Sequence, residues 1–330
     1  MRQRAELVRV AGQLVAALLL GESPALMAAE PTADAARQLE AVVALRAEIP
    51  VEARTASLLG TKRYGSGVVI DDAGLIVTIG YLITEAMAAE VTAAGKTSRA
   101  DVVGFDTESG LGLLRAADPL AVKPLPIGTA QGLAEKTPVI IAGHGGVATA
   151  QLAVVVSRRT FAGYWEYLLE DAIFTAPPHP AWSGAALIAA DGRLAGIGSL
   201  IVGDAADAPG NMFVPIDRLR PIMGDLIALG RPARSRPWIG ANLQDFDGEL
   251  VVQRVAPEGP AETAGLRHGD HVIGIDGFLV HDLADFYRAL WDHGEPGITV
   301  KLTVNRDREQ HEVGVKTIDR YRYLRLGTTY

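Results

Sequence analysis

The sequence contains no cysteine and few aromatic residues, which occupy 6% of its 330 positions. Without cysteine, the chain has no thiol nucleophile, no disulfide framework and no cysteine-ligated metal site. Its seven histidines include no pair at the spacing of a zinc-binding helix. We therefore expect neither a bound metal nor another cofactor.

The sequence also has no block of basic residues interleaved with aromatic residues. Acidic side chains outnumber basic ones by 39 to 31, which gives a net charge of −8. Nucleic-acid binding needs a basic surface that neutralises phosphates, so this composition argues against a nucleic-acid partner. Extensive binding to an anionic membrane surface is unsupported for the same reason.

No apolar run is long enough to span a bilayer comfortably, but a shorter one lies near the N-terminus. Three arginines among the first nine residues precede an apolar run from Val10 to Leu20, and small residues follow up to Ala29. A charged start, a short apolar middle and a small-residue exit are typical of a secretory signal peptide. We expect residues 1–29 to direct the protein to the periplasm or otherwise out of the cell. An uncleaved membrane anchor and a buried helix are the alternatives.

Glycine and proline are frequent, with 36 and 18 residues, and they separate many short apolar runs after residue 40. Short runs bounded by turn residues predict strands, and Asp71–Gly74 and Ala190–Gly192 are typical hairpin turns. The pattern favours an all-β sandwich or barrel, between which periodicity alone does not decide. The predicted strands are 41–45, 67–70, 75–78, 89–93, 100–103, 111–114, 138–142, 150–157, 167–172, 185–188, 194–201 and 212–215.

A helical pattern and a linker follow these strands. Apolar residues on one face predict a helix over 216–229 that ends at Gly230, with its regular part beginning near Pro221. Residues 230–237 have the composition of a linker. A second unit begins at Trp238, and its predicted elements are strands at 250–252, 271–275 and 299–304 and a helix at 283–291.

Three motifs in a fixed order resemble the HtrA/Deg family of serine proteases. Gly65–Thr78 resembles the entry to that family's histidine loop, Val102–Leu114 its aspartate region, and Ser183–Ile197 its nucleophile loop with the following hairpin. The resemblance covers about residues 41–230. It implies a trypsin-like pair of six-stranded antiparallel barrels over 30–230, including the linker helix, in a chain dominated by β-structure.

The second unit resembles the PDZ domain found in the same family. The resemblance is carried by residues 236–241 and 260–277, where Gly265, Gly269 and Gly277 stand at turns that a side chain would hinder. It implies an α+β PDZ domain over 231–318. A tail at 319–330 follows, in which the alternation of residues 321–326 has strand period and predicts pairing with a sheet edge.

The catalytic residues implied by the resemblance are mostly replaced. Ser183 keeps the nucleophile position, but Tyr81 stands where the family has histidine and Gly110 where it has aspartate. A phenol with an ordinary pKa of about 10 takes up a proton poorly at neutral pH, and glycine has no side chain to orient a base. Losing the base costs serine proteases on the order of a millionfold in turnover. We expect Ser183 to be a relic nucleophile and the chain to be a pseudoprotease rather than an enzyme.

The oxyanion-hole position is altered as well. Ala181 replaces the glycine two residues before the serine, and an alanine forced to positive φ costs about 1–2 kcal/mol. His179 is the first candidate for a substitute base, although a solvated loop histidine is the simpler expectation for it. His144 is a weaker candidate, and the lysines Lys62 and Lys96 are expected to lie on loops.

The PDZ-like unit has no equivalent replacements. Such domains add a ligand chain as an extra strand at an open sheet edge, and backbone N–H groups before that edge hold the ligand's terminal carboxylate. The resemblance assigns this role to the loop Trp238-Ile239-Gly240-Ala241. Phe286 and Leu290, with Tyr287 between them, are the candidates for the apolar pocket.

Three functions follow as hypotheses. The first is an exported, inactive HtrA relative that binds polypeptides or protein C-termini as a scaffold, chaperone or subunit of a larger complex in protein quality control. The second is an active serine endopeptidase that uses Ser183 with a non-standard base. The third is a purely structural subunit of an envelope complex, whose PDZ groove is covered by a partner or by the protein's own tail. Because HtrA proteins often form trimers, a homo-oligomer is also a candidate state.

Overall fold

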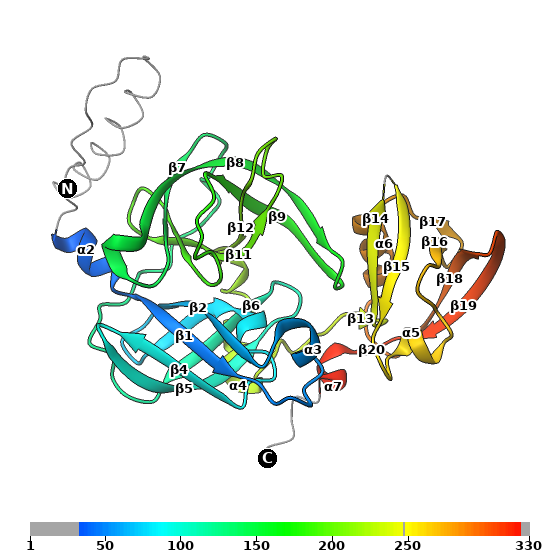
Figure 1. The fold of residues 1–330 in the computed structure, drawn as a ribbon, viewed down its shortest axis with the longest axis horizontal. Helices are drawn as coiled ribbons and strands as arrows, with labels where there is room; N and C mark the ends of the chain where they lie inside the picture. Colours follow the sequence, from blue (N-terminus) through cyan, green and yellow to red (C-terminus); the bar gives the residue numbers. More distant parts are fainter. Residues whose placement is uncertain (1–32, 247, 325–330) are drawn as a thin grey trace. The chain divides into compact units, whose positions relative to one another are not determined.

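A computed structural model describes residues 33–246 and 248–324 (Figure 1). The predicted signal peptide at 1–29 and the end of the tail lie outside the described residues. Contacts divide the chain into two compact units. The second unit contains the chain from Pro232 onward together with two short segments, Thr107–Ser109 and Thr160–Asp171, and the first unit contains the remainder.

Six strands of the first unit's described residues close into an antiparallel barrel in the order β1-β2-β3-β6-β5-β4. Strand β3 is buried along its whole length, and β1 presents alternating residues to the barrel interior, as expected for a small barrel filled by side chains. The strands are β1 (Val42–Glu48), β2 (Lys62–Val69), β3 (Leu75–Ile79), β4 (Ala88–Ala93), β5 (Lys96–Phe105) and β6 (Leu111–Ala116).

A second barrel of six strands follows in the described chain, in the order β10-β11-β12-β9-β8-β7. Its core gathers buried aliphatic side chains around Ile141, Leu187 and Phe213. The predicted pair of six-stranded trypsin-like barrels is therefore confirmed. The strands are β7 (Pro138–Ala142), β8 (Ala150–Gly163), β9 (Tyr167–Ala176), β10 (Ala186–Ile188), β11 (Leu194–Val202) and β12 (Gly210–Pro215).

Short helices connect and flank these strands. The helix predicted over 216–229 is divided into a 3-10 turn and a regular helix that begins at Met223, because Pro221 lacks an N–H and disfavours a helix interior. Gly230 ends it at φ 74°, where its N–H caps the Leu226 carbonyl. None of the described helices is both long and apolar enough to cross a membrane. The helices are α2 (Ala33–Leu39), α3 (Ala56–Leu59), η1 (Gly80–Leu82), η2 (Gly146–Thr149), η3 (Ile216–Arg218) and α4 (Met223–Leu229).

The described part of the second unit contains a small main sheet, a two-stranded sheet and three short helices, and the main sheet with the first two helices is the arrangement expected for a PDZ domain. Its main sheet has the order β14-β15-β16-β18-β19, with β17 paired to β16, so that β14 is an edge strand within the described residues. The elements are β13 (Pro237–Trp238), β14 (Ala241–Phe246), β15 (Glu249–Val255), α5 (Pro260–Thr263), β16 (His271–Ile275), β17 (Phe278–Leu279), α6 (Leu283–Asp292), β18 (Thr299–Arg306), β19 (Glu309–Lys316) and β20 (Ile318–Asp319).

The prediction of a strand at 321–326 was wrong for the described part of the tail. The chain pairs earlier, where β20 meets β13, and then turns into helix α7 (Arg320–Tyr323). The Asp319 side chain accepts a hydrogen bond from the Tyr321 N–H and caps this helix. Tyr321 is buried, so packing and capping override the alternation of residue types.

A buried ion pair fixes the turn before β16. Asp270 is 1% exposed and accepts hydrogen bonds from Arg306 Nε at 2.6 Å and from the Arg267 N–H at 2.8 Å. Burial alone would raise the pKa of Asp270, but the hydrogen bonds from Arg306 and Arg267 lower it overall. The ion pair therefore joins the α5–β16 turn to the end of β18.

We expect Asp270→Ala to destabilise the second unit by about 3–5 kcal/mol, because Arg306 would keep a partly buried charge without its partner. Thermal or guanidinium unfolding of the full chain measures this effect. Glu312→Ala is the control, because its contact with Lys301 is exposed and worth less than about 1 kcal/mol. Equal stability of the two variants would contradict the assigned role of Asp270.

Candidate functional site

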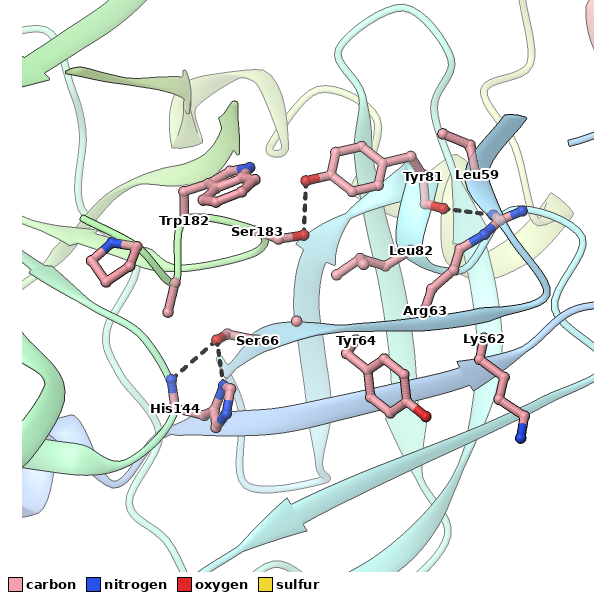
Figure 2. A pocket seen from close by; sticks show the side chains of 13 residues that line it. Leu59, Lys62, Arg63, Tyr64, Ser66, Tyr81, Leu82, His144, Trp182 and Ser183 are labelled. Atoms are coloured by element: carbon pink, nitrogen blue, oxygen red, sulfur yellow. Dashed lines mark hydrogen bonds between the residues drawn. The ribbon is translucent and has the colours of Figure 1, made fainter. Parts of the chain in front are cut away.

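Of the predicted site positions of the first unit, Tyr81, Ala181 and Ser183 line a pocket of about 420 Å³ (Figure 2). Strand β2 and the loop before β10 contribute most of its walls, and Leu59 of α3, Tyr81 and Leu82 of η1, and His144 complete them. Its lining mixes aromatic, aliphatic and basic side chains. Across the described residues, no group of three or more histidine or acidic side chains is placed to hold a metal ion.

Backbone contacts with β2 and β11 hold the loop that carries Ser183, called here the serine loop, in place. The Ser66 N–H donates to the Ser183 carbonyl at 2.8 Å, and the Gly184 N–H donates to the Gly198 carbonyl at 2.9 Å. Gly184 has φ +73°, and a Cβ on it would lie 1.9 Å from the Ser66 carbonyl oxygen. Only glycine fits there, so its retention keeps the loop in this conformation.

Tyr81 occupies the position beside the serine and hydrogen-bonds it directly. Its hydroxyl lies 2.7 Å from Ser183 Oγ (Figure 2). It also donates to the Ser199 carbonyl at 2.9 Å. A carbonyl can only accept, so the single phenol proton points to Ser199, and Ser183 is left to donate its own proton to the phenol oxygen. No histidine or lysine side chain among the described residues hydrogen-bonds the Ser183 hydroxyl.

Burial raises the pKa of Tyr81 to about 12, and hydrogen bonds with Ser183 and Trp182 oppose this shift. The phenol therefore stays protonated throughout the range in which proteases work. A neutral phenol that already donates its proton accepts a hydrogen bond from Ser183 but does not act as a base.

Arg63 anchors the backbone on which Tyr81 sits. Its guanidinium donates to the Tyr81 carbonyl at 2.6 Å (Figure 2). It also donates to the Thr84 carbonyl at 3.0 Å. The side chain is 4% exposed, and burial lowers the pKa of Arg63 to about 10, while Glu85 raises it. Arg63 thus remains charged and holds η1 against β2.

Gly110 contacts the segment that carries Tyr81 by a backbone hydrogen bond. The Gly80 N–H donates to the Gly110 carbonyl at 2.6 Å, and the Gly110 N–H donates to the Asp106 carbonyl at 2.9 Å. Gly110 has φ +78° and serves as a turn residue. It contributes no side chain to the pocket.

The expectations for Ala181 and His179 were partly wrong. Ala181 is not among the residues with positive φ, so it carries no left-handed strain. Its N–H donates to His179 Nδ1 at 3.1 Å and is thereby turned to a side chain of its own loop. His179 is 4% exposed rather than solvated, because Asn211 accepts from its N–H and its Nε2 meets the Thr149 carbonyl at 2.6 Å. Both of its ring nitrogens are used for structure.

His144 lines the pocket but bonds to a different serine. Its Nδ1 lies 3.1 Å from Ser66 Oγ, which also accepts from the His144 N–H at 3.0 Å (Figure 2). This contact joins the second barrel's loop to β2. His144 was expected only as a weaker candidate for the base of Ser183, and its side chain contacts Ser66 instead.

In the second unit, the predicted carboxylate-binding loop holds a carboxylate from the same chain. The N–H groups of Ile239, Gly240 and Ala241 donate to the two carboxylate oxygens of Glu166 at 3.1, 2.7 and 3.1 Å. Trp238, the first residue of the predicted loop, is buried, and its ring centroid lies 4.5 Å from that of Tyr323.

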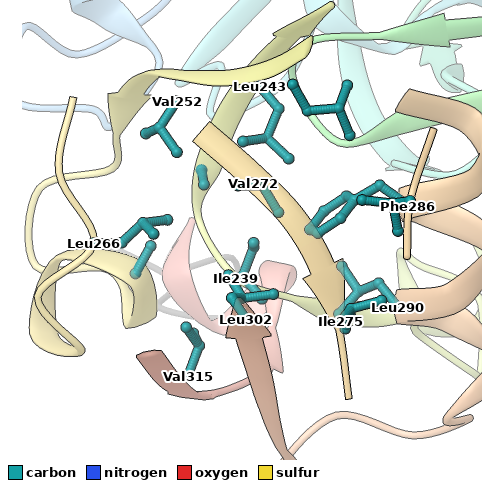
Figure 3. Close-up of a cluster of buried hydrophobic side chains, with 14 of the residues drawn as sticks. Ile239, Leu243, Val252, Leu266, Val272, Ile275, Phe286, Leu290, Leu302 and Val315 are labelled. Carbon is teal, nitrogen blue, oxygen red and sulfur yellow. The ribbon is translucent and has the colours of Figure 1, made fainter. Parts of the chain in front are cut away.

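Phe286 and Leu290 are fully buried on α6. They belong to one hydrophobic cluster with Ile239 and Leu243 of the loop and edge strand (Figure 3). Leu168, from the segment that carries Glu166, is part of the same cluster. The predicted apolar pocket is therefore packed by side chains of the unit itself.

Known proteins share both units. Residues 65–197 match the trypsin-like peptidase domain, and residues 237–317 match the PDZ domain. The serine protease Do-like HtrA of Lactobacillus helveticus is 28% identical over 292 residues, covering 78% of this chain and 69% of that protein. The putative serine protease HhoA of Synechocystis is 29% identical over 274 residues, covering 74% and 67%.

Solved structures agree with this match. An HtrA-type protease, AlgW with decapeptide, has a TM-score of 0.52 at 21% identity, covering 86% of this chain and 96% of that chain. A serine endoprotease from Yersinia pestis has a TM-score of 0.52 at 23% identity, covering 88% and 99%. The chain is similar to HtrA-type proteins over both units. Its described fold joins a trypsin-like protease domain to a PDZ domain.

Glu166, Ser199 and Arg320 contribute to the two sites of this HtrA-like protein but were not expected from its sequence. One signal for Glu166 was present, because it is a lone acid between aromatic residues at the turn joining two predicted strands. Ser199 acts through its backbone carbonyl, which residue type does not reveal. Arg320 lay in a segment that was interpreted as part of the tail.

We expect Tyr81→Phe to destabilise the HtrA-like protein by about 1–2 kcal/mol, because the Ser199 carbonyl and the Ser183 hydroxyl would both lose their partner. Thermal unfolding of the full chain measures this loss. Tyr64→Phe is the matched control, since Tyr64 lines the same pocket and is 62% exposed. A Tyr81 variant as stable as this control would contradict the hydrogen-bond assignment.

Proposed function

We propose that this HtrA-like protein is an exported, proteolytically inactive binder of polypeptide C-termini, acting as a scaffold, chaperone or subunit of a larger complex. The observation that carries the proposal is the hydrogen-bond chain from Ser183 through Tyr81 to the Ser199 carbonyl. A serine nucleophile needs a neighbouring base for its proton. Here the series of hydrogen bonds ends on a backbone carbonyl, which does not take up a proton.

The second element of catalysis is also weakened. An oxyanion hole needs backbone N–H groups aimed at the developing negative charge. The Ala181 N–H is directed to His179 Nδ1 and is not free to serve this purpose. Gly110 leaves the aspartate position without a carboxylate. Three elements of the trypsin-like mechanism are thus altered: the base, the oxyanion hole and the aspartate.

The names of the relatives favour the alternative, an active serine endopeptidase, because they are described as serine proteases. The identity of 28–29% reflects the whole fold and says little about any one position. The contacts of Ser183 bear directly on its chemistry, and they support the inactive protein. For the alternative to hold, His144 or His179 would have to leave its present partners and reach the Ser183 hydroxyl.

The PDZ domain supports the binding half of the proposal. Its loop directs three successive N–H groups at a carboxylate, which is the chemistry that recognises a chain terminus. The adjacent strand β14 lies at the sheet edge within the described chain, where an extended peptide adds as a further strand. The proposal that the protein is exported rests on the pattern of residues 1–29, which resembles a signal peptide.

We expect the purified protein to leave unfolded casein uncut and to resist a fluorophosphonate probe at about pH 7.5 and at about pH 10. Because the pKa of Tyr81 is raised to about 12, only about 1% of this phenol is ionised at the higher pH, where an ordinary tyrosine is half ionised. Gel fluorescence and peptide mapping measure labelling of Ser183.

Trypsin is the positive control for the probe, and Ser183→Ala gives the background. Labelling that disappears in Ser183→Ala, at either pH, would defeat the proposal of an inactive site and favour the serine endopeptidase. If Ser183→Ala still cleaves casein, the preparation contains a contaminating protease. Further purification removes this protease before the variants are compared.

A further inference from the structure

Glu166 sits at the turn between β8 and β9, in a backbone conformation that glutamate rarely adopts. Its φ is +56°, in the left-handed region where glycine is preferred. A residue held there indicates that other contacts outweigh the local strain, and such residues are concentrated at functional sites. The segment that carries it, Thr160–Asp171, belongs to the second unit together with the PDZ domain.

The carboxylate of Glu166 fills the site that a ligand terminus would take. It is 4% exposed and accepts all three N–H groups that the loop Ile239–Ala241 directs at it. An incoming carboxylate needs the same three donors, so it and Glu166 cannot occupy the loop together.

The flanking residues of Glu166 also follow the pattern of a bound peptide. The carbonyl of Tyr164 accepts a hydrogen bond at 3.2 Å from the N–H of Leu243 on the edge strand β14. Leu168 packs into the hydrophobic cluster that contains Phe286 and Leu290. The segment thus supplies a carboxylate, a main-chain contact to the edge strand and an apolar side chain, which are the three features that PDZ domains recognise.

Two further residues hold this segment. Tyr287 Oη donates to the Gly163 carbonyl at 2.8 Å and accepts from the Glu166 N–H at 3.0 Å. Arg320 donates to the Trp165 carbonyl at 3.1 Å, and its charge attracts the Glu166 carboxylate. The helix α7 therefore contributes to the carboxylate site from the far end of the domain sequence.

The contact is built to be reversible. Burial raises the pKa of Glu166 to about 7, although the three N–H groups and Arg320 lower it, so the ionised carboxylate is held against a desolvation penalty. A chain terminus brings the same carboxylate without requiring a left-handed glutamate. When a chain terminus displaces Glu166, the three N–H groups bind a new carboxylate in place of the old one. The left-handed turn at Glu166 is then free to relax.

We propose that the segment Gly163–Leu168 is an internal ligand of the PDZ domain, and that an external C-terminal peptide binds by displacing Glu166 from the loop Ile239–Ala241. This inference rests on the proposed function, because it assumes that the domain binds chain termini. It adds the step that controls access: the site is closed in the free protein and opens when the β8–β9 turn is released.

The test compares full-length wild type with Glu166→Gly, Glu166→Gln and the control Asp307→Gly. Glycine suits the left-handed turn, so Glu166→Gly removes the carboxylate and keeps the backbone conformation. Asp307 is an exposed residue at φ 52° in the β18–β19 turn, so its variant makes the same kind of change in the same unit, away from the loop. Circular dichroism verifies that each variant is folded.

The probe is a pool of fluorescein-labelled peptides with randomised C-terminal residues and a free carboxylate, followed by anisotropy. We expect Glu166→Gly to bind about 10- to 100-fold more tightly than wild type, the factor that applies if the open loop is populated at about 1–10%. Glu166→Gln should fall between them, because its amide oxygen still accepts N–H groups but lacks the charge that Arg320 attracts. Asp307→Gly should match wild type, and an amidated pool should bind none of the proteins.

Hydrogen exchange at the amides of Ile239, Gly240 and Ala241 gives a readout that needs no ligand. These amides should exchange slowly in wild type and Asp307→Gly and faster in Glu166→Gly. Equal peptide affinity in wild type and Glu166→Gly, or equal exchange at the three amides, would overturn the internal ligand and leave the proposed function standing. Faster exchange in Glu166→Gly with no peptide bound by any variant would instead overturn the proposed binding of chain termini.

Discussion

The chemistry of the trypsin-like pocket depends on where one proton goes. The Tyr81 hydroxyl is committed to the Ser199 carbonyl, so Ser183 donates to an oxygen that has no basic lone pair to offer at neutral pH. Arg63 holds the Tyr81 backbone, and Gly184 fixes the serine loop against β2, so neither partner is free to rearrange. The barrel framework that would align a catalytic pair here aligns two hydroxyl groups.

In both units, a residue of the chain itself hydrogen-bonds the polar groups of the predicted site. In the first, a phenol occupies the space beside the serine; in the second, the carboxylate of Glu166 occupies the loop Ile239–Ala241. The physical reason is common to both, because a buried donor or acceptor without a partner costs about 1–3 kcal/mol. Three N–H groups that converge on one point are stable in a folded protein only when water, a ligand or a residue of the chain meets them.

The sequence predicted most strands well because they are short apolar runs closed by turn residues, as at Asp71–Gly74, whereas the pair of barrels was implied by the resemblance to the HtrA/Deg family. The resemblance to PDZ domains also assigned the loop Trp238–Ala241, whose expected role depends on backbone N–H groups and therefore on position. It did not predict what those groups bind, since Glu166 lies about seventy residues away and reaches them only through the fold. His179 was misjudged for the same reason: its burial depends on Asn211 and Thr149, which its neighbours in the sequence do not reveal.

The two internal occupants differ in how firmly they are held. Tyr81 lies on a 3-10 turn secured by Arg63 and Gly80, and removing its hydroxyl leaves two polar groups without a partner. Glu166 lies on a hairpin turn in a left-handed conformation that costs about 1–3 kcal/mol, and burial disfavours its charge. An external carboxylate can replace Glu166 at little net loss of hydrogen bonds, whereas no common ligand replaces a phenol fixed between two backbone segments. In both units a residue of the chain thus meets polar groups at the expected site: Tyr81 holds the position beside Ser183 firmly, whereas Glu166, on our proposal, is displaceable.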